Sequence, residues 1–270
     1  MKILALLFAV AFAGCAASGP PRHGETIHRD LVYARRGGRA LHVDLYVPAA
    51  PRPAPVVVWL HGGSWKYGSK GFHLHLRELT GDGFAVAAVQ YRFISQAPWP
   101  APLDDCAEAL RWLHANGAHY GIDPRRVALA GESAGGHLAA LIGLDQGRSR
   151  IKAVCALYPP TDLVALGRRY AKFKRASILT QMFDGDIEDR LDAARAASPV
   201  AHVSANSPPF LLWHGRGDFL VPPQQSVALD RALRDAGVES RLVILPGKTH
   251  AFGLNRGQLD EVATFFHRHL

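Results

Sequence analysis

The sequence contains little sulfur. Three of its 270 residues are cysteine, and none of them forms a C-x-x-C pair. This absence excludes the motif on which structural zinc sites and dithiol redox centres usually depend, so we expect no metal site of that kind. Cys106 falls in a helical pattern and Cys155 in an apolar strand pattern. Export would permit a disulfide between them, but two buried free thiols are the expected state.

Repeats and recognition motifs are also lacking. No internal repeat, heptad run or low-complexity tract occurs, which excludes solenoids and coiled coils. The formal net charge is +8, but the basic residues are scattered. No nucleic-acid recognition motif accompanies them, so we expect no nucleic-acid partner. With 48% hydrophobic residues, a chain of this length can bury the core of one domain.

An apolar run of ten residues, 3–12, lies at the beginning of the chain. It follows Met1-Lys2 and is too short to span a bilayer, so residues 1–14 are predicted to be a signal peptide. The segment Phe12-Ala13-Gly14-Cys15 resembles a bacterial lipobox. We therefore expect an exported protein, lipidated at Cys15 and tethered to a membrane through residues 15–25. Cleavage near residues 11–13 would instead give a secreted or periplasmic protein.

The remaining chain, residues 26–270, alternates strand and helix patterns. Two β-rich runs around Arg36-Gly37-Gly38-Arg39 predict an antiparallel hairpin at one edge of a sheet. Later runs are continuously apolar, as strands covered on both faces are. Helical patterns between them predict right-handed crossovers, helices on both faces and a mostly parallel sheet in an α/β domain. The eight predicted strands lie near 27–33, 41–47, 56–60, 85–89, 127–130, 153–158, 210–213 and 242–245.

The stretch from residue 159 to residue 209 interrupts this alternation. It has helical pieces but no strong strand pattern, which predicts either a lid over the site or a packing insert. The insert carries a basic cluster, predicted to be a solvated helix face. A charged rim near the site, or a contact with anionic lipid headgroups, is the alternative. The cluster consists of Arg168, Arg169, Lys172, Lys174 and Arg175.

The segment Gly131-Glu132-Ser133-Ala134-Gly135 lies where an apolar run ends and a small-residue helical pattern begins. A tight strand-to-helix turn of this kind holds the serine in a strained conformation and exposes its hydroxyl. Only small residues fit on either side of it. Ser133 is therefore the predicted nucleophile.

Two later strands are followed by the residues that a serine nucleophile needs. Asp218 follows the strand near 210–213, and His250 follows the strand near 242–245. The carboxyl ends of parallel strands converge on one crevice, and the order Ser, Asp, His is that of a nucleophile-elbow enzyme. We predict His250 as the base and Asp218 as its partner. Weaker candidates are His214 (packing), His137 (helix surface or support), Glu132 (pocket lining) and Asp162 (spare acid).

Oxyanion donors are predicted from the segment His61-Gly62-Gly63-Ser64-Trp65, directly after the strand near 56–60. Glycines at this position let backbone N–H groups approach a bound carbonyl. We expect the donors to be the amides of Gly63, Ser64 and Ala134.

These motifs, together with Gly217-Asp218 and Gly247–His250, resemble the α/β-hydrolase superfamily. More narrowly, they resemble bacterial esterases related to hormone-sensitive lipase and to the tannase/feruloyl-esterase-like (BD-FAE-like) branch. The third glycine of the usual H-G-G-G is Ser64 here, which narrows the space but keeps the amide. The resemblance implies hydrolysis of short-chain, acetyl or aromatic-acid esters through an acyl-enzyme, without a cofactor.

Two other functions stay open at this point. One is an amidase or peptidase of the same fold, similar to kynurenine formamidases or prolyl oligopeptidases. The other is a non-catalytic binding protein on a hydrolase scaffold. The substrate is also open, because most aromatic residues belong to protein cores. Candidates for an acyl or aryl pocket are Trp65, Phe72, Trp99, Phe183, Phe219 and Phe252.

Overall fold

The computed structural model describes residues 22–145, 150–172 and 177–270. The predicted signal peptide, Cys15 and most of the predicted tether lie outside these residues, as do Lys174 and Arg175. Residues 22–25, the end of the tether, include a turn, and Glu25 is buried. Its carboxylate accepts a hydrogen bond from Nε of Arg77 at 2.7 Å, so this end of the segment is packed against the domain.

Eight strands form one sheet in the order β1-β2-β4-β3-β5-β6-β7-β8. β1 pairs with β2, and β2 with β4, in antiparallel register, whereas every pair from β4 to β8 is parallel. The predicted mostly parallel sheet with an antiparallel hairpin at one edge is therefore confirmed. The strands are β1 (Thr26–Arg36), β2 (Arg39–Val47), β3 (Ala54–Leu60), β4 (Ala85–Val89), β5 (Ile122–Glu132), β6 (Ala153–Leu157), β7 (Phe210–Gly215) and β8 (Ser240–Leu245).

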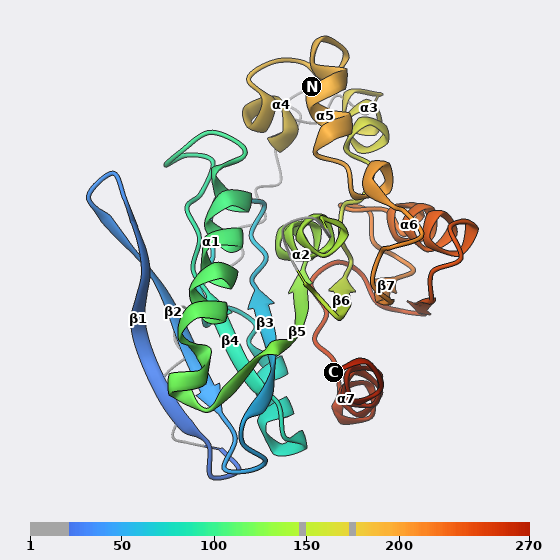
Figure 1. Ribbon diagram of the computed structural model, residues 1–270. Coiled ribbons are helices and arrows are strands. Elements are labelled where there is room, and N and C mark those ends of the chain that lie inside the picture. Colours follow the sequence, from blue (N-terminus) through green and yellow to red (C-terminus); the bar gives the residue numbers. More distant parts are fainter. Residues whose placement is uncertain (1–21, 146–149, 173–176) are drawn as a thin grey trace, which may run out of the picture.

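Helices cover both faces of the sheet, as the continuously apolar strands predict (Figure 1). Alternate strand residues point to opposite faces, so Val56 and Val58 pack in one core and Val57 and Trp59 in the other. The first core is closed by α1 (Ala101–Asn116), α2 (Ala134–Leu144) and α6 (Gln224–Asp235) together with the insert. The second is closed by the 3₁₀ helix η1 (His75–Asp82) and by α7 (Arg256–His269).

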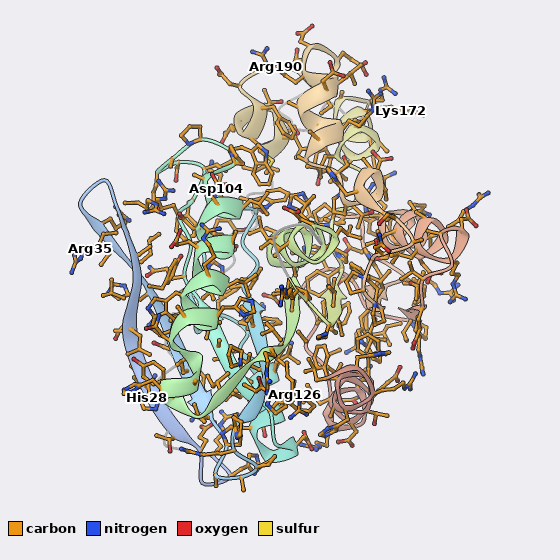
Figure 2. All side chains as sticks on the ribbon, viewed as in Figure 1. His28, Arg35, Asp104, Arg126, Lys172 and Arg190 are labelled. Carbon is orange, nitrogen blue, oxygen red and sulfur yellow. The ribbon has the colours of Figure 1, made fainter. Side chains whose placement is uncertain are left out.

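The insert between β6 and β7 is helical, and its described residues contain no strand. In Figure 2 its Lys172 and Arg190 lie at the end of the molecule opposite His28 and Arg126. The predicted basic cluster is partly neutralised there, because Nε of Arg168 lies 2.8 Å from Oε1 of Glu188. The insert helices are α3 (Leu163–Lys172), α4 (Ile178–Phe183), η3 (Ile187–Arg190), α5 (Leu191–Ala196) and η4 (Pro199–His202), and η2 (Gly117–Tyr120) precedes β5.

Both interior cysteines are free and buried, as expected. Cys106 belongs to one core and Cys155 to the other, on opposite faces of the sheet. Burial raises the pKa of each thiol, which keeps both protonated and unreactive. In the described part of the chain, no helix has the length and apolar character that crossing a membrane requires.

Candidate active site

Ser133 occupies the turn between β5 and α2. Its φ of 49° and ψ of −118° are strained for a residue with a side chain. The flanking glycines explain why the chain can turn here. A Cβ on Gly135 would lie 2.0 Å from the carbonyl oxygen of Leu60, and one on Gly131 would lie 2.4 Å from that of Gly135. The local sequence thus fixes the serine at the carboxyl end of a central strand.

The structure brings the three predicted catalytic side chains together. Nε2 of His250 lies 3.0 Å from Oγ of Ser133, and Nδ1 of His250 lies 2.6 Å from Oδ2 of Asp218. A carboxylate only accepts hydrogen bonds, so Nδ1 carries the proton. Nε2 is then the acceptor for the serine hydroxyl. This is the geometry in which a histidine can remove the proton from a serine nucleophile.

Asp218 and His250 meet because their two loops are joined. The N–H of Gly217 donates to the carbonyl of Lys248 at 2.9 Å. A Cβ on Gly215 would lie 2.5 Å from the carbonyl oxygen of Thr249, so the end of β7 approaches the loop after β8 too closely for any side chain. Glycine in this position therefore brings the two loops within reach of each other.

Asp218 is buried but well supplied with donors. Its Oδ1 accepts hydrogen bonds from the N–H groups of Leu220 at 3.0 Å and Val221 at 2.9 Å. Burial by itself would raise the pKa of Asp218. The hydrogen bonds from His214 and His250, the charge of His250 and the Val221 N–H outweigh it and lower the pKa to about 2. Asp218 is therefore an anion at neutral pH.

Two of the predicted oxyanion donors, Gly63 and Ser64, lie in the loop after β3. Gly63 has a φ of 115°, and a Cβ there would lie 2.0 Å from the carbonyl oxygen of Tyr67. Ser64 has a φ of 54°, so both residues hold a left-handed backbone. Among the described residues, no hydrogen bond uses the N–H of Gly63, Ser64 or Ala134. Of these three residues, Ser64 lines the same cavity as Ser133.

The His61 side chain holds this loop in place through contacts that the sequence does not reveal. Its ring is buried, stacks on Tyr91 at 4.3 Å and donates from Nδ1 to the carbonyl of Gly62 at 2.7 Å. The Tyr91 hydroxyl donates in turn to the carbonyl of His61 at 2.7 Å. Burial lowers the pKa of His61 to about 4, so the ring is neutral at physiological pH.

A cavity of about 230 Å³ opens beside Ser133. It is lined mostly by apolar side chains, several of which come from the insert. The Tyr170 hydroxyl donates to the carbonyl of Leu220 at 2.9 Å and so joins the insert to the loop that carries Asp218. Of the six aromatic candidates, Trp65 alone belongs to the described lining. The lining consists of Ser64, Trp65, Ser133, Pro160, Leu166, Tyr170, Ile178, Leu220 and Val221.

Several weaker candidates lie elsewhere. Glu132 is buried, and its carboxylate accepts from the Tyr158 hydroxyl at 2.6 Å and from Nδ1 of His73 at 2.9 Å, so it does not line the described cavity. The hydrogen bond with Glu132 raises the pKa of His73. His137 is not on the helix surface: it is fully buried, and its Nε2 donates to the carbonyl of Ala197 at 2.7 Å.

Tyr158 is a neighbour of His250 that sequence reasoning missed. Its ring meets the His250 ring edge-on, with centroids 4.7 Å apart, while its hydroxyl is bound to Glu132. The signal that could have identified it is its position directly after β6, because the carboxyl ends of parallel strands lie at the same edge of the sheet. Asp162, the spare acid, instead accepts from the N–H of Ala165 at 2.9 Å in the first turn of α3.

Comparison with known proteins agrees with this geometry. The BD-FAE family model matches residues 43–233. The chain belongs to this family. A thermophilic esterase of the Planctomycetes species Thermogutta terrifontis, solved with propionate bound, superposes with a TM-score of 0.73. It is 27% identical, and the match covers 91% of this chain and 94% of that one. The fold is the α/β-hydrolase fold.

Two relatives illustrate the functions found in this group. A probable carboxylic ester hydrolase of Mycobacterium tuberculosis, LipM, is 32% identical over 90% of this chain and 62% of its own length. The ethyl acetate hydrolase of Pseudomonas putida is 34% identical over 87% of this chain and 78% of its own length. The chain spans about three fifths of the length of the mycobacterial esterases that it matches.

Proposed function

We propose that the protein is a serine hydrolase that cleaves carboxylic esters through an acyl-enzyme. One observation carries this proposal: His250 is within hydrogen-bonding distance of both Ser133 and Asp218. The family, and relatives named as ester hydrolases, support the same reaction.

The mechanism follows from the positions of these groups. Ser133 Oγ attacks the ester carbonyl while Nε2 of His250 takes its proton. The tetrahedral oxyanion receives hydrogen bonds from the amides of Gly63, Ser64 and Ala134, each worth about 3 kcal/mol in comparable enzymes. The His250 cation is stabilised by the Asp218 carboxylate and returns the proton to the leaving alcohol. Water, activated by the same ring, then releases the acid and frees Ser133.

The cavity beside Ser133 favours small acyl groups. At about 230 Å³ it lies below the roughly 300–1,000 Å³ that drug-sized ligands occupy. Its lining is mostly apolar, which suits an acetyl, propionyl or butyryl chain. We therefore favour short-chain acyl esters, including acetylated sugars, over esters of aromatic acids.

The proposal is tested by labelling and by paired substrates. A fluorophosphonate probe is expected to modify Ser133, identified by peptide mass spectrometry, and Ser133→Ala is expected to abolish labelling. The same variant should lower kcat/KM for p-nitrophenyl acetate by on the order of 10⁴ or more. Faster cleavage of matched p-nitroanilides than of the p-nitrophenyl esters would favour the amidase function. Absence of labelling would favour the binding function.

A further inference from the structure

His214 has surroundings that simple packing does not account for. The side chain is fully buried at the end of β7, four residues before Asp218. Its Nε2 lies 2.8 Å from the carbonyl oxygen of Val221 and 3.3 Å from Oδ2 of Asp218. Its Nδ1 lies 2.7 Å from Oγ of Ser226, which is also buried. Every polar atom of this ring is therefore directed at a specific partner.

These partners fix the position of the proton. A backbone carbonyl only accepts hydrogen bonds, so Nε2 of His214 must carry the proton that it directs at Val221. Nδ1 is then the acceptor for the Ser226 hydroxyl. The same Nε2 lies 3.3 Å from Oδ2 of Asp218, the oxygen to which His250 is bound. Two imidazole nitrogens thus lie close to one carboxylate oxygen.

Val221 closes this arrangement. Its N–H donates to Oδ1 of Asp218 at 2.9 Å, while its carbonyl accepts from His214. The ring of His214 therefore holds both the Oδ2 side of the carboxylate and the backbone segment that binds Oδ1. If the ring is removed, Oδ2 loses a polar neighbour at 3.3 Å and the carbonyl of Val221 loses its hydrogen-bond donor. Both changes free the carboxylate to rotate away from His250.

We propose that His214 is a positioning residue that orients the Asp218 carboxylate toward His250, with Ser226 selecting the required tautomer. The inference rests on the proposed function, because it assigns His214 a role in the same reaction. Its effect acts through Asp218 and not through contact with substrate. His214→Leu should therefore lower kcat and leave KM almost unchanged. A misplaced catalytic group costs on the order of ten- to a hundredfold in rate.

The experiment compares three variants. His214→Leu removes both nitrogens, whereas His214→Gln places an amide N–H2 near the position of Nε2. Arg77→Leu is the structural control, because it removes a buried donor from the carboxylate of Glu25, which also accepts from the N–H of Arg22. Activity with p-nitrophenyl acetate is normalised by fluorophosphonate titration, so that misfolded protein does not count. We expect a lower kcat in His214→Leu and a wild-type kcat in Arg77→Leu. His214→Gln should have a kcat of at least about a third of the wild-type value.

A spectroscopic readout separates this inference from the proposed function. The proton between His250 and Asp218 gives a far-downfield NMR resonance, which should shift or vanish in His214→Leu and persist in the other two variants. If the wild type hydrolyses no ester, the proposed function fails, while the resonance still tests the positioning role. If His214→Leu does not fold, Ser226→Ala is used, and a smaller loss of kcat is expected. Unchanged kcat and resonance, or equal losses in all three variants, would overturn the inference.

Discussion

Leu166 offers a direct test of how the insert limits the substrate. The side chain is buried on α3 and lines the cavity that contains Ser133. Leu166→Ala removes three carbons from the wall and opens room for about three more carbons of an acyl chain. At about 0.8 kcal/mol for each buried methylene, the longer chain gains up to roughly 2.4 kcal/mol, or about fiftyfold.

The assay is a series of p-nitrophenyl esters from acetate to octanoate. In Leu166→Ala, kcat/KM for hexanoate relative to acetate should rise by up to about fiftyfold. Leu163→Ala is the matched control, because Leu163 is buried on the same helix but is not part of the described lining. Both variants should lose about 2–5 kcal/mol of stability. An unchanged hexanoate-to-acetate ratio in Leu166→Ala, or an equal rise in Leu163→Ala, would refute the assignment of this cavity to the acyl group.

Three further predictions concern stability. Because the folded-state pKa of Asp218 is about 2, below its ordinary 3.8, the ionised carboxylate stabilises the fold above pH 4, and this contribution is lost as the pH falls through 2. The difference in melting temperature between wild type and Asp218→Asn should therefore shrink from pH 5 to pH 2. A difference that stays constant over this range would contradict the prediction. Glu25→Ala leaves the buried Arg77 without its carboxylate and should cost on the order of 3 kcal/mol of unfolding free energy in urea, against at most about 1 kcal/mol for the more exposed Glu78→Ala. Gly135→Ala forces a Cβ onto two backbone carbonyls and should cost about 3 kcal/mol or more, whereas Gly257→Ala, at ordinary contact distance, should be neutral in the same measurement.

The sheet was predictable from the sequence because its signals are local. The apolar runs from Val56 to Leu60 and from Ala85 to Val89 have the composition of strands covered on both faces, whatever surrounds them. The positions of Ser133, Asp218 and His250 at strand ends were predictable for the same reason. Parallel strands place their carboxyl ends along one edge, so order along the chain is enough to predict which residues meet.

The supporting contacts were not predictable, because they join segments far apart in the sequence. The hydrogen bond from Tyr170 to Leu220 depends on how the insert settles against another loop. The burial of His137 also depends on a distant segment. The sequence predicts an exposed or supporting residue, because it does not show that the insert places the carbonyl of Ala197 beside the ring. No pattern within one element records such contacts, since packing between elements decides them.

The order of the strands determines when the proposed catalytic site can be completed. Ser133 and the proposed oxyanion amides follow the interior strands β3 and β5, whereas His250 follows β8, the edge strand and the last of the eight along the sequence. A chain in which β8 has not yet joined the sheet therefore has no base beside Ser133. In such a chain the Ser133 hydroxyl would have only the reactivity of an ordinary serine, so the proposed chemistry requires β8 to be in place.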